Sequence, residues 1–445
     1  MTIWSPRLPE TPEPIYSRIA DALERDIRTG VLVPSSRLPT HRELARSLRI
    51  TPVTVTRAYA EAMRRGLVES ATGRGTFVRP TIGRRESVSA IETDLATNIV
   101  SVPLPAPSRA LMERAGEVLT TSTYVTGPGT ERHRAAGAAW IGRDTDPSRV
   151  VVTAGTQHAL FLAFAATTRP GDVVFVEELT YHGVKGVAAM LGVRLEPLPL
   201  DRYGLMPDAL DRACRGRMST KVLYTVPSLH NPTGVVMPET RRREVARVAL
   251  AHGLTLIEDD VCGFLLEKTP SPLAAFAPDR TIFITGLGKA LAPAMRVGYL
   301  SAPEGMLARV QSALASTILF ASPVMAEMAA TWIEDGTAAR VVAQKRAEVQ
   351  LRNRLARRVL QHASGDARSP HLWVELPKRW TADAFVEEAR RRRVRVAAAA
   401  SFAVREEAPR AIRVSIGAPA TIAELEQALH VLAGIGEQRR EEPVV

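Results

Sequence analysis

The first eighty residues open with an apolar stripe that has helical spacing. Its members stand four residues apart and are Ile15, Ile19, Leu23 and Ile27. Residues at this interval lie on one face of an α-helix, so the pattern predicts an amphipathic helix over residues 14–29. Gly30 follows directly and favours an end to the helix there.

Two further helices are predicted from their start signals. Thr40 and Glu43 stand three residues apart and form a capping-box pattern, which predicts a helix through residue 48. Thr51 followed by Pro52 has the composition of an N-cap and a first helical position, so a third helix is expected to about residue 65.

A short hairpin is predicted after the third helix. Residues 68–70 and 75–78 have strand-like composition and are separated by a turn that contains Gly73. Three helices and a hairpin make a winged helix-turn-helix, which we assign to residues 1–79. Residues 80–93 have no clear period and are expected to be a linker, and the tail from 438 is expected to be disordered.

From residue 94 to 440, short apolar runs alternate with helical ones. The runs are residues 150–152, 173–176, 222–225, 254–257 and 281–284, with helices expected at 156–168 and 239–251. Apolar runs of this length are typical of strands buried on both faces of a mostly parallel sheet. The pattern predicts an α/β domain with a large lobe at about 120–318 and a smaller α+β lobe mainly at 322–440.

Composition narrows the class of protein. No apolar stretch approaches the length of a membrane span, and there are only two cysteines, so we expect a cytoplasmic protein without membrane association. The net charge is +11, and residues 1–80 contain thirteen Arg, no Lys and eight acidic residues. A net charge of +5 there attracts phosphates but does not by itself identify nucleic acid as the partner.

The most informative residue is Lys289, in the stretch TGLGKALAP at 285–293. It comes after three polar motifs, GTQ at 155–157, HNPTG at 230–234 and EDD at 258–260. Lys289 and these motifs resemble the site of pyridoxal 5'-phosphate proteins, whose chemistry needs an amine, an acid for the ring nitrogen, donors for the phosphate and a stacking plane. The alternatives are a surface lysine and, for the acidic motif, a metal site or helix cap. Suitably spaced His or Cys ligands are absent, so no metal is expected.

The N-terminal stretches LPTHRELA at 38–45, TVTRAY at 54–59 and GRGTFV at 73–78 resemble the GntR signature. The resemblance implies a third helix in the major groove and a wing that touches the backbone or the minor groove. It makes four residues the expected contacts to double-stranded DNA, Arg42, Thr54, Arg57 and Arg74. Two departures are Pro52, where many relatives have Arg, and Arg49, which replaces the usual turn glycine.

The order of the later motifs resembles the fold type I, aspartate aminotransferase-like pyridoxal phosphate proteins. The resemblance implies a Schiff base at Lys289, the catalytic position, and a substrate carboxylate at Arg413. It also implies cofactor-binding roles, which fall on Asp259 for the ring nitrogen, Asn231 and Cys262 near the ring hydroxyl, Tyr181 for stacking, and Thr156, Gln157 and Arg296 for the phosphate. Tyr124 matches a residue that reaches the partner subunit's phosphate, which implies a homodimer.

The chain departs from the family pattern at three site positions. Gly286 and Gly288 stand where relatives commonly have serines, and Cys262 stands where relatives have Tyr. A thiol is a poor donor to the ring oxygen. Two lost phosphate donors at roughly 1.5–3 kcal/mol each predict weaker cofactor binding unless other groups compensate.

The complete arrangement resembles the MocR subgroup of GntR regulators. It implies a DNA-binding regulator whose aminotransferase-like domain binds pyridoxal 5'-phosphate and senses the cofactor, or an amine or amino acid effector. Two alternatives stay open. The first is a working aminotransferase that keeps a DNA-binding arm, and the second is a scaffold without cofactor that only dimerises the DNA-binding domains.

Overall fold

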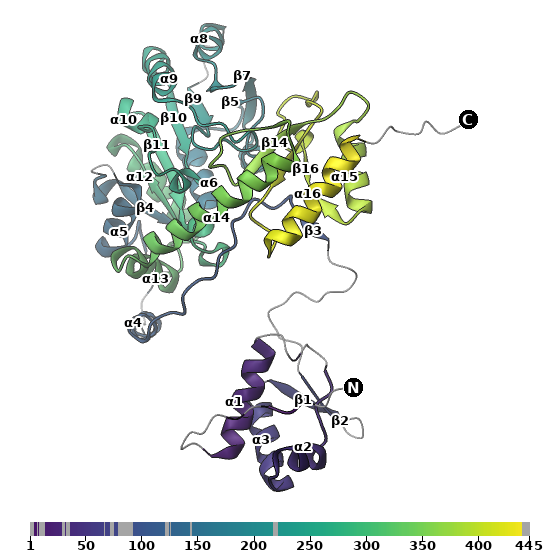
Figure 1. The fold of residues 1–445 in the computed structure, drawn as a ribbon. Helices are drawn as coiled ribbons and strands as arrows, with labels where there is room; N and C mark the ends of the chain where they lie inside the picture. The colour runs from purple at the N-terminus through teal and green to yellow at the C-terminus, as the bar shows by residue number, and fades with distance from the viewer. Residues whose placement is uncertain are drawn as a thin grey trace. The chain divides into compact units, whose positions relative to one another are not determined.

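The computed structural model describes most of the chain, which divides into two compact units, Met1–Ile91 and Glu92–Val445. The described residues are 4–6, 8, 14–28, 32, 36–65, 67–71, 75–78, 92–120, 124, 126–142, 145–216 and 221–437. Most of the predicted linker, the tail from 438 and Arg74 of the wing lie outside these ranges. Figure 1 shows the fold of both units.

The first unit has the predicted three helices and hairpin. They are α1 (Ile15–Arg28), α2 (His41–Leu48), α3 (Pro52–Arg64), β1 (Val68–Ala71) and β2 (Gly75–Val78). Both predicted N-caps are present, because the side chain of Thr40 accepts from Glu43 N and that of Thr51 accepts from Thr54 N. Strands β1 and β2 pair antiparallel. The element pattern of the winged helix is therefore confirmed.

Two members of the predicted apolar stripe belong to the core of this unit, whereas Ile15 at its start is 41% exposed. Ile19 and Leu23 of α1 are fully buried and pack with Leu44 of α2 and Tyr59 of α3. The Tyr59 hydroxyl donates to the carbonyl of Pro39 at 2.8 Å, which satisfies the polar end of a buried ring. Arg49 stands at the turn position where glycine is usual, and it adopts the left-handed conformation with φ 54°.

A seven-stranded sheet forms the centre of the second unit. Its strands are β4 (Val150–Thr153), β5 (Val173–Glu177), β6 (Arg194–Leu198), β9 (Val222–Thr225), β10 (Thr255–Asp259), β11 (Thr281–Gly286) and β12 (Gly298–Ser301). The order is β4-β12-β11-β10-β9-β5-β6, and only β12 runs antiparallel to its neighbours. The mostly parallel sheet is confirmed, but the sequence reading did not identify β6 or β12. Neither run is as continuously apolar as the strands that it found.

Helices cover the sheet and fix the position of its strand ends. Those used below are α5 (Glu131–Ile141), α6 (Thr156–Thr167), α7 (His182–Met190), α9 (Glu239–Ala251), α11 (Leu287–Ala290) and α13 (Pro323–Glu334). Helix α6 packs its buried face, including Leu160 and Phe164, against Val174, Ile257 and Ile284 of the sheet. This large apolar cluster holds the carboxyl ends of the parallel strands in fixed register.

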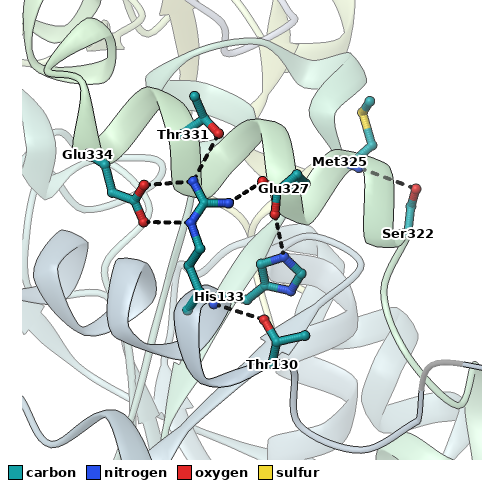
Figure 2. Close-up of polar contacts among 8 residues, drawn as sticks. Thr130, His133, Ser322, Met325, Glu327, Thr331 and Glu334 are labelled. Atoms are coloured by element: carbon teal, nitrogen blue, oxygen red, sulfur yellow. Dashed lines mark hydrogen bonds and ion pairs between the residues drawn. The ribbon is translucent and has the colours of Figure 1, made fainter. Parts of the chain in front are cut away.

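A polar network joins α5 to α13, about two hundred positions apart in the chain (Figure 2). Arg132 donates to Glu327 and to Glu334, at 2.6 Å for the closest Glu334 oxygen. His133 Nε2 lies 3.2 Å from the other Glu327 oxygen. Burial alone would raise the pKa of Glu327, but the hydrogen bonds from Arg132 and His133 outweigh it and lower that pKa. The network satisfies a buried carboxylate that would otherwise be costly.

The smaller lobe combines an antiparallel sheet with helices. Its elements are α14 (Thr337–Val359), β13 (Ala363–Ser364), β14 (His371–Glu375), α15 (Ala382–Arg391), β15 (Val394–Arg395), β16 (Ala397–Ala398), β17 (Ala411–Ser415) and α16 (Ile422–Glu437). The four-stranded sheet has the order β13-β14-β17-β16, and the long helix α14 runs from the large lobe to this lobe (Figure 1). The short strand β3 (Thr93–Asp94) pairs with β15, so Thr93, the last residue of the predicted linker, belongs to this lobe.

Candidate functional site: polar residues at the strand ends

The predicted cofactor residues lie at or just beyond the carboxyl ends of sheet strands. Asp259 is the last residue of β10, and Lys289 lies in α11 directly after β11. Tyr181 is the residue before α7, and Thr156 and Gln157 open α6. Carboxyl ends of parallel strands share one edge of a sheet, and ligands bind there in open α/β sheets. The fold therefore places motifs from distant parts of the chain at one edge.

Asp259 is buried and only half satisfied. Its Oδ2 accepts from the hydroxyl of Tyr224 at 2.7 Å, whereas Oδ1 has no hydrogen-bond partner within the described residues. Burial raises the pKa of Asp259 to about 6, although the hydrogen bond from Tyr224 and the nearby positive charge of Lys289 oppose this rise. A buried oxygen without a donor requires an explanation, and a protonated ring nitrogen is a donor of the right kind.

The start of α6 is arranged for an anion. Its N-cap is Gly155, with φ 86° and no side-chain cap, so the first backbone N–H groups of the helix are not used by a capping side chain. Arg296 lies over this glycine, because a Cβ on Gly155 would come within 3.3 Å of the guanidinium carbon. Its Nη2 also donates to the carbonyl of Ala154 at 3.3 Å. Arg296 and the start of α6, which were predicted to bind the phosphate, therefore lie next to each other.

The two unusual glycines differ in their surroundings. A Cβ at Gly286 would lie 2.8 Å from the methyl carbon of Thr156 and 2.9 Å from the carbonyl of Val297. At Gly288 nothing lies within 4 Å. Position 286 therefore has no room for a serine side chain, because Thr156 lies close to β11 there. Position 288 has room for one. This contrast was not visible in the sequence.

Arg413 and Asn231 form a direct contact between the lobes. Arg413 Nη1 donates to Asn231 Oδ1 at 2.8 Å, and its guanidinium carbon lies 4.7 Å from the centre of the Phe402 ring. Burial lowers the pKa of Arg413 to about 10, which leaves it charged at neutral pH. The residue proposed for a substrate carboxylate therefore adjoins the residue proposed for the cofactor ring.

Of the other predicted cofactor residues, Cys262 is buried and Tyr124 is exposed. Cys262 is 3% exposed and packs in an apolar cluster with Val100 and Leu229, and burial raises the pKa of its thiol. Tyr124 is 89% exposed, so a single chain leaves it in solvent. In the first unit, Arg42 and Arg57 are exposed and Thr54 is half-buried.

Sequence reasoning missed three residues at this edge. Tyr224 supports Asp259 from β9, and His182 lies 4.8 Å from the Tyr181 ring, with its pKa lowered by burial and by Arg413. Lys345 of α14 is buried, and its Nζ donates to the carbonyls of Lys289 and Leu291 at 2.8 and 2.9 Å. Burial lowers the pKa of Lys345 to about 8. A lysine in a helix of mixed polarity gives no sequence signal of such a role.

A separate cavity of about 820 Å³ lies on the other face of β11. Thr281, Phe283 and Thr285 line it, whereas Ile282 and Ile284 pack on the α6 side. None of the predicted cofactor residues lines this cavity. The strand-end site is therefore distinct from it.

Each of the two units matches a known protein family. Residues 90–432 match the family of aminotransferase class I and II, and residues 15–78 match the gntR family of bacterial regulatory proteins. The HTH-type transcriptional regulator YdeF of Bacillus subtilis is 32% identical over 448 residues, covering 96% of both chains. The probable rhizopine catabolism regulatory protein MocR of Rhizobium meliloti is 25% identical, over 73% of this chain and 72% of that one.

Solved structures agree on the fold. An archaeal alanine:glyoxylate aminotransferase superposes with a TM-score of 0.71 at 24% identity, over 78% of this chain and 91% of that chain. A Thermus thermophilus aspartate aminotransferase variant gives 0.70 at 21% identity, over 80% and 99%. In the described part of the chain, no helix combines the length and apolarity needed to cross a bilayer.

Proposed function

Because the chain belongs to the aminotransferase class I and II family and carries a gntR-family domain, we propose how this transcriptional regulator is controlled. Its aminotransferase-like unit binds pyridoxal 5'-phosphate through Lys289. It senses either the cofactor itself or an amine or amino acid effector. The DNA-binding unit then answers to the state of that site.

The observation that carries this proposal is the unpartnered Oδ1 of Asp259. This buried oxygen belongs to a carboxyl whose other oxygen is held by Tyr224, and the charge of Lys289 is close enough to lower its pKa. Tyr224 fixes the orientation of the carboxyl, so that Oδ1 is available for a ring nitrogen. The residues present therefore fit the cofactor.

When bound, pyridoxal phosphate would supply an aldehyde that condenses with amines. The protein's own groups would hold it in place. Arg296 and the start of α6 would bind the phosphate, Tyr181 would lie against the ring, and Lys345 would hold the turn that carries Lys289. Arg413 would bind the carboxylate of an amino acid, and Asn231 would contact the ring hydroxyl.

Borohydride trapping tests the cofactor proposal directly. Wild-type protein is saturated with pyridoxal phosphate, reduced with borohydride, digested and analysed by mass spectrometry. The cofactor mass is expected on Lys289 and is expected to be absent in Lys289→Ala. The matched control is Lys268→Met, which removes an exposed lysine. Unmodified Lys289 in saturated protein would refute the cofactor proposal.

The DNA-binding residues form the second part of the proposal. Arg42 in α2 and Arg57 in α3 are exposed on the unit that matches the gntR family. We expect Arg57→Ala to weaken binding to the DNA that flanks its own gene, and to reduce the salt slope by about 1 if the contact is to phosphate. Arg247→Ala, which removes an exposed arginine of α9 in the other unit, is the control. Unchanged binding in both Arg42→Ala and Arg57→Ala would remove these assignments.

A homodimer in the cytoplasm completes the proposal. Tyr124 is 89% exposed, and Leu119 and Met112 of the preceding helix α4 (Arg109–Leu119) are also exposed, at 74% and 57%. Exposed large apolar side chains support an interaction surface in this part of the chain. Sedimentation analysis is expected to give twice the chain mass, and a monomer at micromolar concentration would contradict this part.

The second candidate function is a working aminotransferase. It would use the same Lys289, Asp259 and Arg413, but the thiol of Cys262 is a poor donor to the ring oxygen. Sustained amino transfer to an added keto acid would favour this candidate over the regulator without turnover.

A further inference from the structure

Arg413 is held by two acceptors of its own chain. Its Nη1 donates to Asn231 Oδ1 at 2.8 Å, and its Nη2 donates to the backbone carbonyl of Ala96. Its Nε is buried and has no hydrogen-bond partner within the described residues. Arg413 is 3% exposed, so bulk water does not satisfy this donor.

The free Nε and the occupied Nη2 belong to one edge of the guanidinium. Arginine binds a carboxylate best through two parallel N–H···O bonds from one such edge. On this edge of Arg413, Nε has no partner within the described residues, and Nη2 donates to the carbonyl of Ala96. A carboxylate that binds both nitrogens competes with that carbonyl for Nη2.

Asp94 sets the position of the Ala96 carbonyl. Its Oδ1 accepts from Ala96 N at 2.8 Å and from Thr97 N at 2.9 Å, and its Oδ2 accepts from the Thr97 hydroxyl at 2.7 Å. Leu95 between them is fixed on both sides of its backbone, to Arg395 and to Ser415, each at 2.8 Å. The turn at residues 94–97 is therefore built to hold one carbonyl against Arg413.

This turn lies where the chain enters the aminotransferase-like unit. Glu92 is the first residue of that unit, and β3 (Thr93–Asp94) pairs with β15. Farther along, the segment is packed closely, since a Cβ on Gly417 would lie 2.1 Å from the carbonyl oxygen of Ile99. A change at Ala96 would therefore act on the stretch of chain that leads directly from the DNA-binding unit.

We infer that the carbonyl of Ala96, positioned by Asp94, is displaced from Arg413 when an effector carboxylate binds. This inference rests on the proposed function, because it requires Arg413 to be the carboxylate site. It also selects the class of effector. A simple amine can reach Lys289 but leaves Ala96 in place, so the regulating ligand is an amino acid, which carries a carboxylate as well as an amine. Asp94 is a positioning residue that weakens carboxylate binding by holding the competitor.

Two matched variants test the role of Asp94. Asp94→Asn keeps an oxygen that can accept from both amides, whereas Asp94→Ala removes the turn, and both remove the same charge. The full-length, cofactor-loaded proteins are titrated by calorimetry with 2-aminoisobutyrate, which has no Cα hydrogen to lose, and with isopropylamine, which lacks the carboxylate. We expect Asp94→Ala to bind 2-aminoisobutyrate about three- to tenfold more tightly than Asp94→Asn, the effect of one weakened competing bond. Isopropylamine should bind both variants equally.

Hydrogen exchange in the wild type tests the displacement without any substitution. Exchange at the amides of Ala96 and Thr97 is expected to increase with 2-aminoisobutyrate and to stay unchanged with isopropylamine. Equal or weaker binding by Asp94→Ala, or exchange that does not respond to the carboxylate, would overturn this inference and leave the proposed function standing. If neither probe binds the cofactor-loaded wild type, the effector proposal fails, and this inference fails with it.

Discussion

The DNA-binding unit and the strand-end site differ in how far apart in the sequence their contacting residues lie. In the first unit, helices α2 and α3 are fixed by caps between residues three apart, such as Thr40 with Glu43. In the site, Arg413 contacts a carbonyl 317 positions away, and Tyr224 supports Asp259 from another strand. Local contacts can be read as patterns, but long-range supports exist only once the sheet has formed.

The same difference separates what the two regions expose. The residues expected to contact DNA are exposed or half-buried on the surface of short helices, so their chemistry needs little support. Among the residues expected to bind the cofactor, Asp259, Asn231 and Cys262 are buried, and burial shifts the pKa of Asp259. We expect substitutions in the site to alter stability and charge together, and substitutions in the winged helix to alter one local element.

The largest expected effect concerns the pH dependence set by Glu177, a buried carboxyl at the end of β5. Burial raises its pKa to about 7, from an ordinary value of 4.5, although Thr225 and Val226 N donate to it. The folded state keeps the proton that the unfolded state releases, so stability falls as pH rises from about 4.5 to above 7. The full loss is about 3 kcal/mol for a shift of this size.

Glu177→Gln removes this titration, because a side-chain amide has no group that titrates in this pH range. Its oxygen can still accept both hydrogen bonds. Urea unfolding of the second unit at pH 5 and pH 8 is expected to show a smaller loss of stability in the variant than in the wild type. Glu178→Gln makes the same chemical change at a partly exposed neighbour and is the control. An identical loss in Glu177→Gln and wild type would show that the carboxyl is already ionised in the folded protein.

The pair Gly286→Ser and Gly288→Ser gives an intermediate effect. A side chain at 286 would clash with Thr156 and the Val297 carbonyl, so Gly286→Ser is expected to cost about 2 kcal/mol of stability. Gly288→Ser enters open space and is expected to be nearly neutral, or to tighten cofactor binding if its hydroxyl reaches the phosphate. Thermal unfolding and cofactor titration measure both. Equal destabilisation by the two variants would contradict the packing argument.

The smallest expected effect is confined to the first unit. Thr40→Ala removes the cap of α2 and one half of its capping box, which typically costs about 1 kcal/mol. Unfolding of the winged helix is expected to shift, while cofactor binding by the second unit stays as in the wild type. Thr40→Ser, which keeps the hydroxyl, is the matched control. A loss of cofactor binding in Thr40→Ala would break the contrast between the two regions.

Several features of the fold could be predicted because each has a local cause. The spacing of Ile19 and Leu23, the N-caps at Thr40 and Thr51, and the apolar run of β11 each act over a few residues. Strand β12 was missed because its antiparallel pairing with β11 and β4 is set by neighbours, not by its own short sequence. The order of polar motifs was readable because each follows a buried strand.

By itself, the sequence determined the winged helix, the mostly parallel sheet and the position of Lys289 after a strand. Only the tertiary structure decided which groups support that lysine and its neighbours, namely Lys345 under the turn, Tyr224 beside Asp259 and Ala96 on Arg413. The physical reason is that hydrophobic period and capping act between near neighbours in the chain. Burial, orphaned donors and competing acceptors arise only when distant segments exclude water together.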